Sequence, residues 1–315
     1  MENEKNDNKS NEDYLKQYLN DTSAGSTNNM KFNFNEPTKE DKSTKTGDLQ
    51  YFAFDAKITP LGKFYPNGTR ILVRPATVKE IQIYSTVDDN NPYDIIEKMN
   101  DMIASCVRIK YNDDTVSSYL NTKDGDRFYL IFLIHELTFQ TGTRLVANAV
   151  CDCGKETSIE IKRDNFVFHE NDDMMDKYFD DYKKKFVFDL QNGDNFEVGI
   201  PTVGLQKSFT DFIIREFKEK KATPNMSFLK VIPFLVSSQL TITDAEIKEK
   251  LSNFQNMNDD SFQFINDAVG RLKFGIKEVK KTCDCGLEVH SDDIFPSGAS
   301  GIFVVSGAFE RFIKK

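Results

Sequence analysis

The chain has 315 residues and a formal net charge of −9, which disfavours a nucleic-acid partner because phosphate binding needs a concentrated positive surface. Its length and its 39% of hydrophobic residues suffice for two ordinary domains, or for one large domain with a tail. The longest apolar runs, 128–137 and 228–236, are too short to span a membrane, and residues 1–14 lack the apolar core of a secretory signal, so we expect the protein to begin in a reducing cytoplasm.

Residues 1–48 are the first predicted segment. They are rich in Asn, Asp, Lys, Ser, Thr and Glu and contain few large apolar residues. Such a composition cannot bury enough surface to offset the entropy of ordering, so we predict a disordered polar tail. Within it Tyr14, Leu15, Tyr18 and Leu19 have helical spacing, which fits either a short docking helix or stray apolar residues.

The remainder predicts an α+β fold of two pseudo-repeated halves. We place the first half at residues 49–164, a connector at 165–185, the second half at 186–295 and a C-terminal extension at 296–315. Each half begins with an Asn-Gly turn, a strand and a Pro-Thr-Val element whose threonine suits a helix N-cap. Asn67 and Asn192 are 125 residues apart, and Cys151 and Cys283 are 132 apart, which supports duplication with small loop insertions.

The expected elements follow from hydrophobic periodicity and capping residues. In the first half we expect a strand at 69–74, helices at 93–107 and 126–137, and strands at 145–150 and 157–162. In the second half we expect a strand at 195–200, helices at 205–220, 227–240, 244–254 and 260–272, and strands at 276–282 and 287–291. The proposed N-caps are Asp126, Ser227, Thr243 and Asp260.

Each half is expected to end in a β-hairpin with the same turn sequence, Cys-Asp-Cys-Gly. The turns are Cys151-Asp152-Cys153-Gly154 and Cys283-Asp284-Cys285-Gly286. In a reducing compartment paired cysteine turns are more typical of metal sites than of disulfides. Four thiolates in a tetrahedron suit Zn²⁺, so we predict one structural zinc ion bound by Cys151, Cys153, Cys283 and Cys285 in a split zinc-ribbon-like site.

Three alternatives to this site stay open. The usual zinc knuckle has two residues between its cysteines and these turns have one, so both could be hairpin turns without metal. A Cys151–Cys153 disulfide would close a small, strained ring. His290 could also replace one thiolate.

No constellation of residues indicates catalysis. The three histidines are His135 in an apolar run, His169 in an acidic connector and His290 beyond the second turn. Cys106 follows an apolar helical stretch and is expected to be a small core residue. Phosphate loops, nucleophile elbows and HExxH motifs are absent from the sequence, so we predict a non-enzymatic protein and keep an enzyme with a dispersed site as a remote alternative.

Six stretches stand out by their order along the chain. They are Pro60-Leu61-Gly62-Lys63-Phe64-Tyr65-Pro66-Asn67-Gly68, Arg74-Pro75-Ala76-Thr77-Val78-Lys79-Glu80, Asn91-Pro92-Tyr93-Asp94, Asp126-Arg127-Phe128, Glu136-Leu137-Thr138-Phe139 and Phe274-Gly275-Ile276. With them the chain resembles, over about residues 58–296, the T4-like phage baseplate proteins that serve as hub assembly chaperones or hub components of contractile tails. It departs from that pattern in its CxC turns, its polar N-terminal tail and its extension at 296–315.

The resemblance implies a structural or assembly protein of a contractile-tailed phage. Its partners would be baseplate hub and tail proteins, with no nucleic acid, membrane or small-molecule substrate. It would act in the host cytoplasm during virion assembly, or remain in the tail baseplate. The alternative function is a zinc-ribbon binding module associated with nucleic acid or transcription, which shares the cysteine turns but not the acidic charge.

Overall fold

A computed structural model describes residues 50–139, 145–169, 172–190, 193–220, 225–276, 279–291, 299 and 302–303. The predicted tail at 1–48, with its candidate docking helix, and most of the extension at 296–315 lie outside the described residues.

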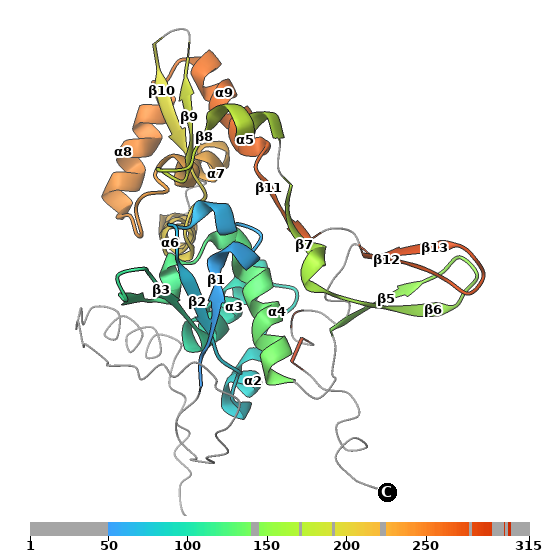
Figure 1. Ribbon diagram of the computed structural model, residues 1–315. Coiled ribbons are helices and arrows are strands. Elements are labelled where there is room, and N and C mark those ends of the chain that lie inside the picture. The colour runs from blue at the N-terminus through green and yellow to red at the C-terminus, as the bar shows by residue number, and fades with distance from the viewer. Residues whose placement is uncertain are drawn as a thin grey trace, which may run out of the picture. The chain divides into compact units, whose positions relative to one another are not determined.

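The described strands form small antiparallel sheets (Figure 1). The strands are β1 (Phe52–Asp55), β2 (Arg70–Val73), β3 (Val107–Lys110), β4 (Val116–Ser117), β5 (Val146–Val150), β6 (Glu156–Glu160), β7 (Phe166–His169), β8 (Phe179–Asp180), β9 (Lys185–Asp189), β10 (Asn195–Val198), β11 (Lys273–Ile276), β12 (Val279–Thr282) and β13 (Glu288–Ser291). The four-stranded sheet has the order β1-β2-β3-β4 and the three-stranded sheet the order β10-β9-β8, while β11 pairs with β7, β12 with β13 and β5 with β6. The mixture of small sheets and helices confirms the α+β class.

The helices of the described residues match most of the expected ones. They are α2 (Val78–Tyr84), α3 (Pro92–Cys106), α4 (Arg127–Thr138), α5 (Asp172–Tyr178), α6 (Val203–Lys220), α7 (Met226–Leu235), α8 (Asp244–Gln255) and α9 (Asp259–Gly270). Short 3₁₀ turns are η1 (Ala56–Ile58), η2 (Gly62–Phe64), η3 (Tyr119–Asn121), η4 (Asp124–Asp126) and η5 (Arg163–Asn165). The Pro-Thr-Val prediction is confirmed, because Thr77 closes a capping box with Glu80 and Thr202 accepts from the Leu205 amide.

Two of the four proposed N-caps are wrong, and a third, Asp126, stands at the N-cap position of α4 without a side-chain hydrogen bond to the helix. Thr243 is confirmed by a capping box with Glu246. Asn225 caps α7 in place of Ser227, and Asn258 caps α9 in place of Asp260, because an Asn side chain two residues earlier already accepts the first amides. Asp126 makes no side-chain cap to α4, since tertiary contacts hold its carboxylate elsewhere.

Three further boundaries differ from the prediction. Helix α7 ends at Leu235 and not at residue 240, because it leads into Ser237 and Ser238, which are weak helix formers. The strand expected at 276–282 is two strands, because β11 pairs with β7 and β12 pairs with β13. The turn at Gly68, with φ +75°, leads into β2, but η1 and η2 lengthen the connection from β1, so the first hairpin is not tight.

The segment expected to connect the halves, 165–185, is rich in paired structure. β7 pairs with β11, with Phe166 opposite Ile276 at one end and His169 opposite Lys273 at the other. β8 pairs with β9. Figure 1 shows β7 and β11 side by side, leading to the two hairpins β5–β6 and β12–β13. The six strands β7, β11, β5, β6, β12 and β13 therefore bring chain segments more than 100 residues apart to one place.

The largest apolar core packs α2, α3 and α4 against the four-stranded sheet. Helix α4 is buried over most of its circumference, from Tyr129 to His135, as expected for a helix that is apolar all round. Ala299, Ile302 and Phe303 of the C-terminal extension are also buried in this core, and the Phe303 ring lies 5.0 Å from that of Tyr84. In a second core, helices α6, α7, α8 and α9 pack together. In a third, Phe64 packs against residues of α5, β9, β10 and α9.

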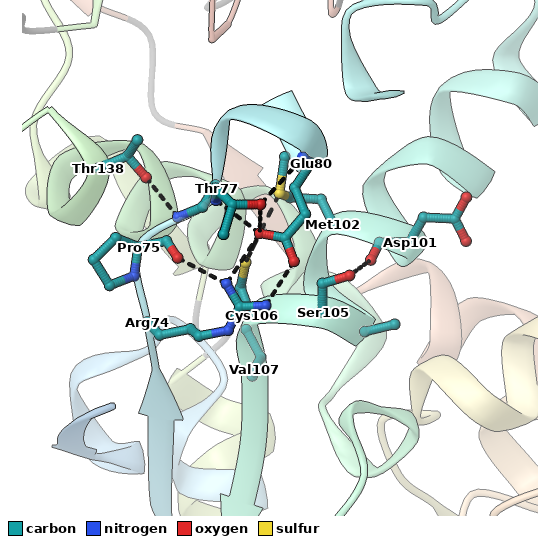
Figure 2. Close-up of polar contacts among 12 residues, drawn as sticks. Arg74, Pro75, Thr77, Glu80, Asp101, Met102, Ser105, Cys106, Val107 and Thr138 are labelled. Atoms are coloured by element: carbon teal, nitrogen blue, oxygen red, sulfur yellow. Dashed lines mark hydrogen bonds and ion pairs between the residues drawn. The ribbon is translucent and has the colours of Figure 1, made fainter. Parts of the chain in front are cut away.

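A charged network around Arg74 and Glu80 lies next to Cys106, a residue of the first core (Figure 2). Arg74 binds both carboxylate oxygens of Glu80 at 2.6 and 3.0 Å, and Glu80 also accepts from the amide and hydroxyl of Thr77. Burial alone would raise the pKa of Glu80, but these hydrogen bonds outweigh it and lower the pKa to about 2. Cys106 lies behind the pair, fully buried, and burial raises the pKa of its thiol to about 12, which confirms an inert core cysteine.

Candidate metal centre

Two hairpin turns with the same hydrogen bonds carry the four cysteines. In the turn between β5 and β6, the Cys151 amide donates to the Lys155 carbonyl and the Gly154 amide to the Cys151 carbonyl. The turn between β12 and β13 repeats both bonds at Cys283 and Gly286. Gly154 and Gly286 have φ of +82° and +89°, a left-handed conformation that glycine adopts without strain. The sequence Cys-Asp-Cys-Gly therefore folds the same way twice.

The hairpins bring all four Sγ atoms together, within 4.8 Å of one another. The Cys151 and Cys285 sulfurs are 3.5 Å apart, and those of Cys153 and Cys283 are 3.8 Å apart. Four sulfurs around a tetrahedral zinc ion, each at about 2.3 Å from the metal, would be separated by about 3.8 Å. The cluster therefore has the size of a tetrathiolate metal site, and its thiols are free, not disulfide-bonded.

The cluster has a covered side and an open side. Each hairpin contributes one buried thiol, Cys151 or Cys283, and one exposed thiol, Cys153 or Cys285. Val289 and Ala149 pack against the buried pair. A metal ion here would have the apolar side chains of Val289 and Ala149 on one side. On the other side solvent could reach it past the exposed cysteines, Cys153 and Cys285.

Polar contacts also join the two hairpins. Lys155 of the first turn forms an ion pair with Asp284 of the second, and the Lys281 ammonium donates to the Ser158 carbonyl at 3.1 Å. The approach of the hairpins is thus supported by contacts beyond the cysteines themselves. The Lys155–Asp284 pair was not identified from the sequence, because it depends on the packing of two turns 129 residues apart.

The thiols influence one another's ionisation. The Cys285 amide and the neighbouring thiols lower the pKa of Cys283 to about 6. For Cys151 the Cys153 amide also favours the thiolate, but burial and hydrogen bonds to the other thiols outweigh it and raise the pKa to about 12. One thiol therefore loses its proton readily and then opposes ionisation of the next. A divalent cation removes this conflict, because a coordinated thiol is deprotonated.

The alternatives drawn from the sequence fit the geometry less well. His290 is outside the group of close ligand atoms, and its imidazole lies 3.8 Å from the Glu288 carboxylate. His135 is buried against Phe139 and Phe303, and burial lowers its pKa to about 4, as suits a neutral core residue. The side chain of His169 lies outside the described residues.

A second polar cluster was missed by the sequence reasoning. The Asp126 carboxylate, fully buried, accepts from the Leu61 amide at 3.0 Å and the Tyr65 hydroxyl at 2.9 Å. The Tyr65 oxygen in turn accepts from the Lys123 amide, and the Lys123 ammonium donates to the Ile200 carbonyl. This cluster joins residues of the two predicted halves. Its only indication in the sequence is Asp126, which was predicted to cap a helix and not to bind Leu61 and Tyr65.

Four sulfur ligands would fill the coordination sphere of a tetrahedral metal and leave no position for substrate, so the cluster suits a structural ion and not a catalytic one.

Within the described part of the chain, no helix has both the length and the apolar character to cross a membrane.

A comparison with protein-family models finds a match over most of the chain. The family model described as T4 bacteriophage base plate protein matches residues 56–296, a stretch that includes both cysteine turns. Neither a curated protein nor a solved structure gives a significant match.

Proposed function

The chain belongs to the T4 bacteriophage base plate protein family, and from this premise we propose that it is a non-enzymatic protein that binds tail components to build the baseplate hub of a contractile-tailed phage. The family match over most of the chain is the observation that carries the proposal, and it indicates a structural or assembly role. The more specific assignment to the baseplate hub rests on the order of the motifs between residues 60 and 276.

The partners we propose are other proteins of the hub and tail. Assembly takes place in the host cytoplasm, and the protein either leaves as a chaperone or stays in the tail baseplate. Surfaces for such partners are available, since Val78, Tyr93 and Tyr182 expose 72%, 52% and 97% of their areas. Tyrosine is among the residues that contribute most of the binding energy at protein interfaces.

The four close cysteines could hold a metal ion, and we propose that the ion is Zn²⁺ bound by Cys151, Cys153, Cys283 and Cys285. Sulfur-only ligation, a tetrahedral spacing and the absence of an open position favour zinc in a structural role. The ion would tie together two hairpins that end the two predicted halves, so its binding free energy would contribute to folding of the whole body.

We also propose that the halves are a pseudo-repeat. The support is the recurrence of one order of features: a strand, a proline, a threonine N-cap, helices and a Cys-Asp-Cys-Gly hairpin. The two turns have the same hydrogen bonds and the same glycine conformation. The first half adds β3 after α3, and β3 pairs with β2, so the halves differ in detail.

Metal binding is tested by native mass spectrometry of the full chain with and without chelator. We expect one zinc ion per chain, its loss in Cys153→Ser/Cys285→Ser, and its retention in the matched control Cys106→Ser. Chelation should also lower the melting temperature of the wild type and leave that of the double variant unchanged. A chain without metal, whose stability is indifferent to chelator, would show that the hairpins are turns only.

The assembly role is tested in infected cells. A tagged chain should co-purify with hub and tail proteins, and a phage that lacks the gene should form no baseplates. Normal tails without this protein would refute the assembly role. Binding to DNA that is tight and strongly weakened by salt would instead favour the zinc-ribbon nucleic-acid module.

A further inference from the structure

The four thiols are arranged as two pairs that cross between the hairpins. Cys151 of the first turn is 3.5 Å from Cys285 of the second, and Cys153 of the first is 3.8 Å from Cys283 of the second. Each pair combines a buried thiol of one hairpin with an exposed thiol of the other. The cluster therefore offers two equivalent routes from solvent to a buried sulfur.

These crossed pairs are close to bonding distance. A disulfide has a sulfur–sulfur length of about 2.05 Å, so each pair must approach by roughly 1.5 Å. Within one turn the situation differs, because the Cys151–Lys155 and Gly154–Cys151 backbone bonds fix a tight loop. A disulfide between cysteines one residue apart would close a small strained ring inside that loop. Bond formation across the hairpins is thus favoured over bond formation within either one.

We propose that the cluster is a site that either a metal ion or two disulfides can close, with the disulfides pairing Cys151 with Cys285 and Cys153 with Cys283. The co-reactant is a small-molecule disulfide. This step goes beyond the proposed structural role, and only its biological setting rests on that role: a metal holds the hairpins in a reducing cytoplasm, and disulfides hold them once a particle is outside the cell.

The reaction balances for each pair. The exposed thiolate attacks the small disulfide, one of whose sulfurs leaves as a thiolate, and a mixed disulfide forms on the protein. The buried thiolate of the other hairpin then displaces the second small-molecule sulfur. Each pair is oxidised by two electrons, and one small disulfide is reduced to two thiolates. Two such reactions consume two oxidant molecules and release the metal as a divalent cation.

As a consequence, disulfides would keep the two hairpins linked after the metal is lost. A bond from residue 151 or 153 to residue 283 or 285 closes a loop of about 130 residues and so restricts the unfolded chain. Removal of the metal under reducing conditions should loosen the hairpins, whereas oxidation of the metal-free chain should restore their connection.

The test is disulfide mapping of the purified full chain. After chelation and treatment with oxidised glutathione, trypsin should leave residues 145–155 covalently joined to residues 282–311, since cleavage sites flank both turns. The thiol of Cys106 should stay free because it is buried. Disulfides confined to one of these peptides, glutathione retained on the cysteines, or four thiols that stay reduced would overturn the proposal.

Two matched variants decide the pairing. Cys151→Ser/Cys285→Ser leaves the crossed pair Cys153–Cys283 and should cross-link at a rate close to that of the wild type. Cys151→Ser/Cys283→Ser leaves the uncrossed pair Cys153–Cys285 and should cross-link several-fold more slowly, a difference that access to the oxidant cannot explain because both remaining thiols are exposed. Equal rates would overturn the proposed pairing, and circular dichroism of the reduced variants checks that both are folded.

The outcome is independent of the proposed function. If no zinc is found but the crossed disulfides form, the metal assignment fails and the pairing stands. If zinc is found and the disulfides form within single turns, the pairing fails and the structural zinc site stands. Baseplate assembly enters neither measurement.

Discussion

The buried carboxylate of Asp126 should make the stability of this protein fall as the pH rises from about 4 to 6. Its environment provides hydrogen bonds from the Leu61 amide and from the Thr59 and Tyr65 side chains, and a nearby ammonium, that of Lys123. Burial outweighs these contacts and raises the pKa of Asp126 from 3.8 to about 6. The folded state therefore binds this proton more tightly than the unfolded state.

The magnitude follows from linkage. Below pH 3.8 the carboxyl is protonated in both states, and its ionisation penalty is absent. Between pH 3.8 and 6 only the unfolded chain ionises, so stability falls with rising pH and levels off above 6. A shift of that size corresponds to about 3 kcal/mol, at 1.36 kcal/mol for each pKa unit. Burial lowers the pKa of Lys123 to about 8, so its ammonium stays protonated throughout this range.

The assay compares wild type with Asp126→Asn by urea unfolding between pH 4 and 6.5 at constant ionic strength. The asparagine keeps an acceptor and cannot ionise, so between pH 4 and 6.5 the variant should gain about 2 kcal/mol relative to wild type, the part of the full shift that falls in this range. A constant offset from its altered hydrogen bonds is expected and does not affect the slope. Contributions of Glu80 and of the cysteines are common to both proteins and cancel. A difference between the two proteins that does not change with pH would refute the reasoning.

Three further predictions concern the stability contributed by single positions. Phe303→Ala should lower the free energy of unfolding by about 3–5 kcal/mol in urea titrations, because a fully packed aromatic ring leaves a cavity; the exposed Val78→Ala should change it by less than about 0.5 kcal/mol. Gly286→Ala should destabilise by about 1–2 kcal/mol through its φ of +89° alone, since no atom lies within 4 Å of the added carbon. Gly270→Ala, in a helix with open space, should stabilise by roughly 0.5–1 kcal/mol, and the same sign for both glycines would contradict the backbone argument. Thr77→Ala should cost about 1 kcal/mol by opening the α2 capping box, measured as a shift in urea midpoint, and no shift would mean that the Arg74–Glu80 pair holds the helix start alone.

Local chemistry explains why much of the fold was predictable. The bounds of α3, α4 and α8 agree with the expected helices to within about two residues, because apolar periodicity and residues such as Thr243 act within one helical turn. The two cysteine turns were also predictable, since the glycine conformation and the turn hydrogen bonds depend on four or five consecutive residues. The errors at Ser227 and Asp260 have the same local origin, because a better capping Asn stands two residues earlier in each case.

The remaining features depend on segments that are far apart in the sequence. Asp126 has the sequence context of an N-cap, but the chain near Leu61 and Tyr65 captures its carboxylate. Residue 276, the first residue of the strand predicted at 276–282, belongs instead to β11, which pairs with β7, and no local pattern specifies that partner. From the sequence, Phe303 in the extension could be either a core residue or a partner-binding residue. The structure shows it in the core, with the rings of Tyr84, His135 and Phe139 around it.

The sequence by itself determined the α+β class, the two Cys-Asp-Cys-Gly hairpins and the four cysteines as one candidate metal centre, because identical turns and soft ligands follow from short segments. Only the tertiary structure decided which thiols face each other, which are buried and which ion pair supports them. Those properties arise from packing one hairpin on another, and packing depends on backbone paths set by more than 100 intervening residues. The crossed arrangement of the sulfurs is therefore a property of the fold and not of the CxC motif.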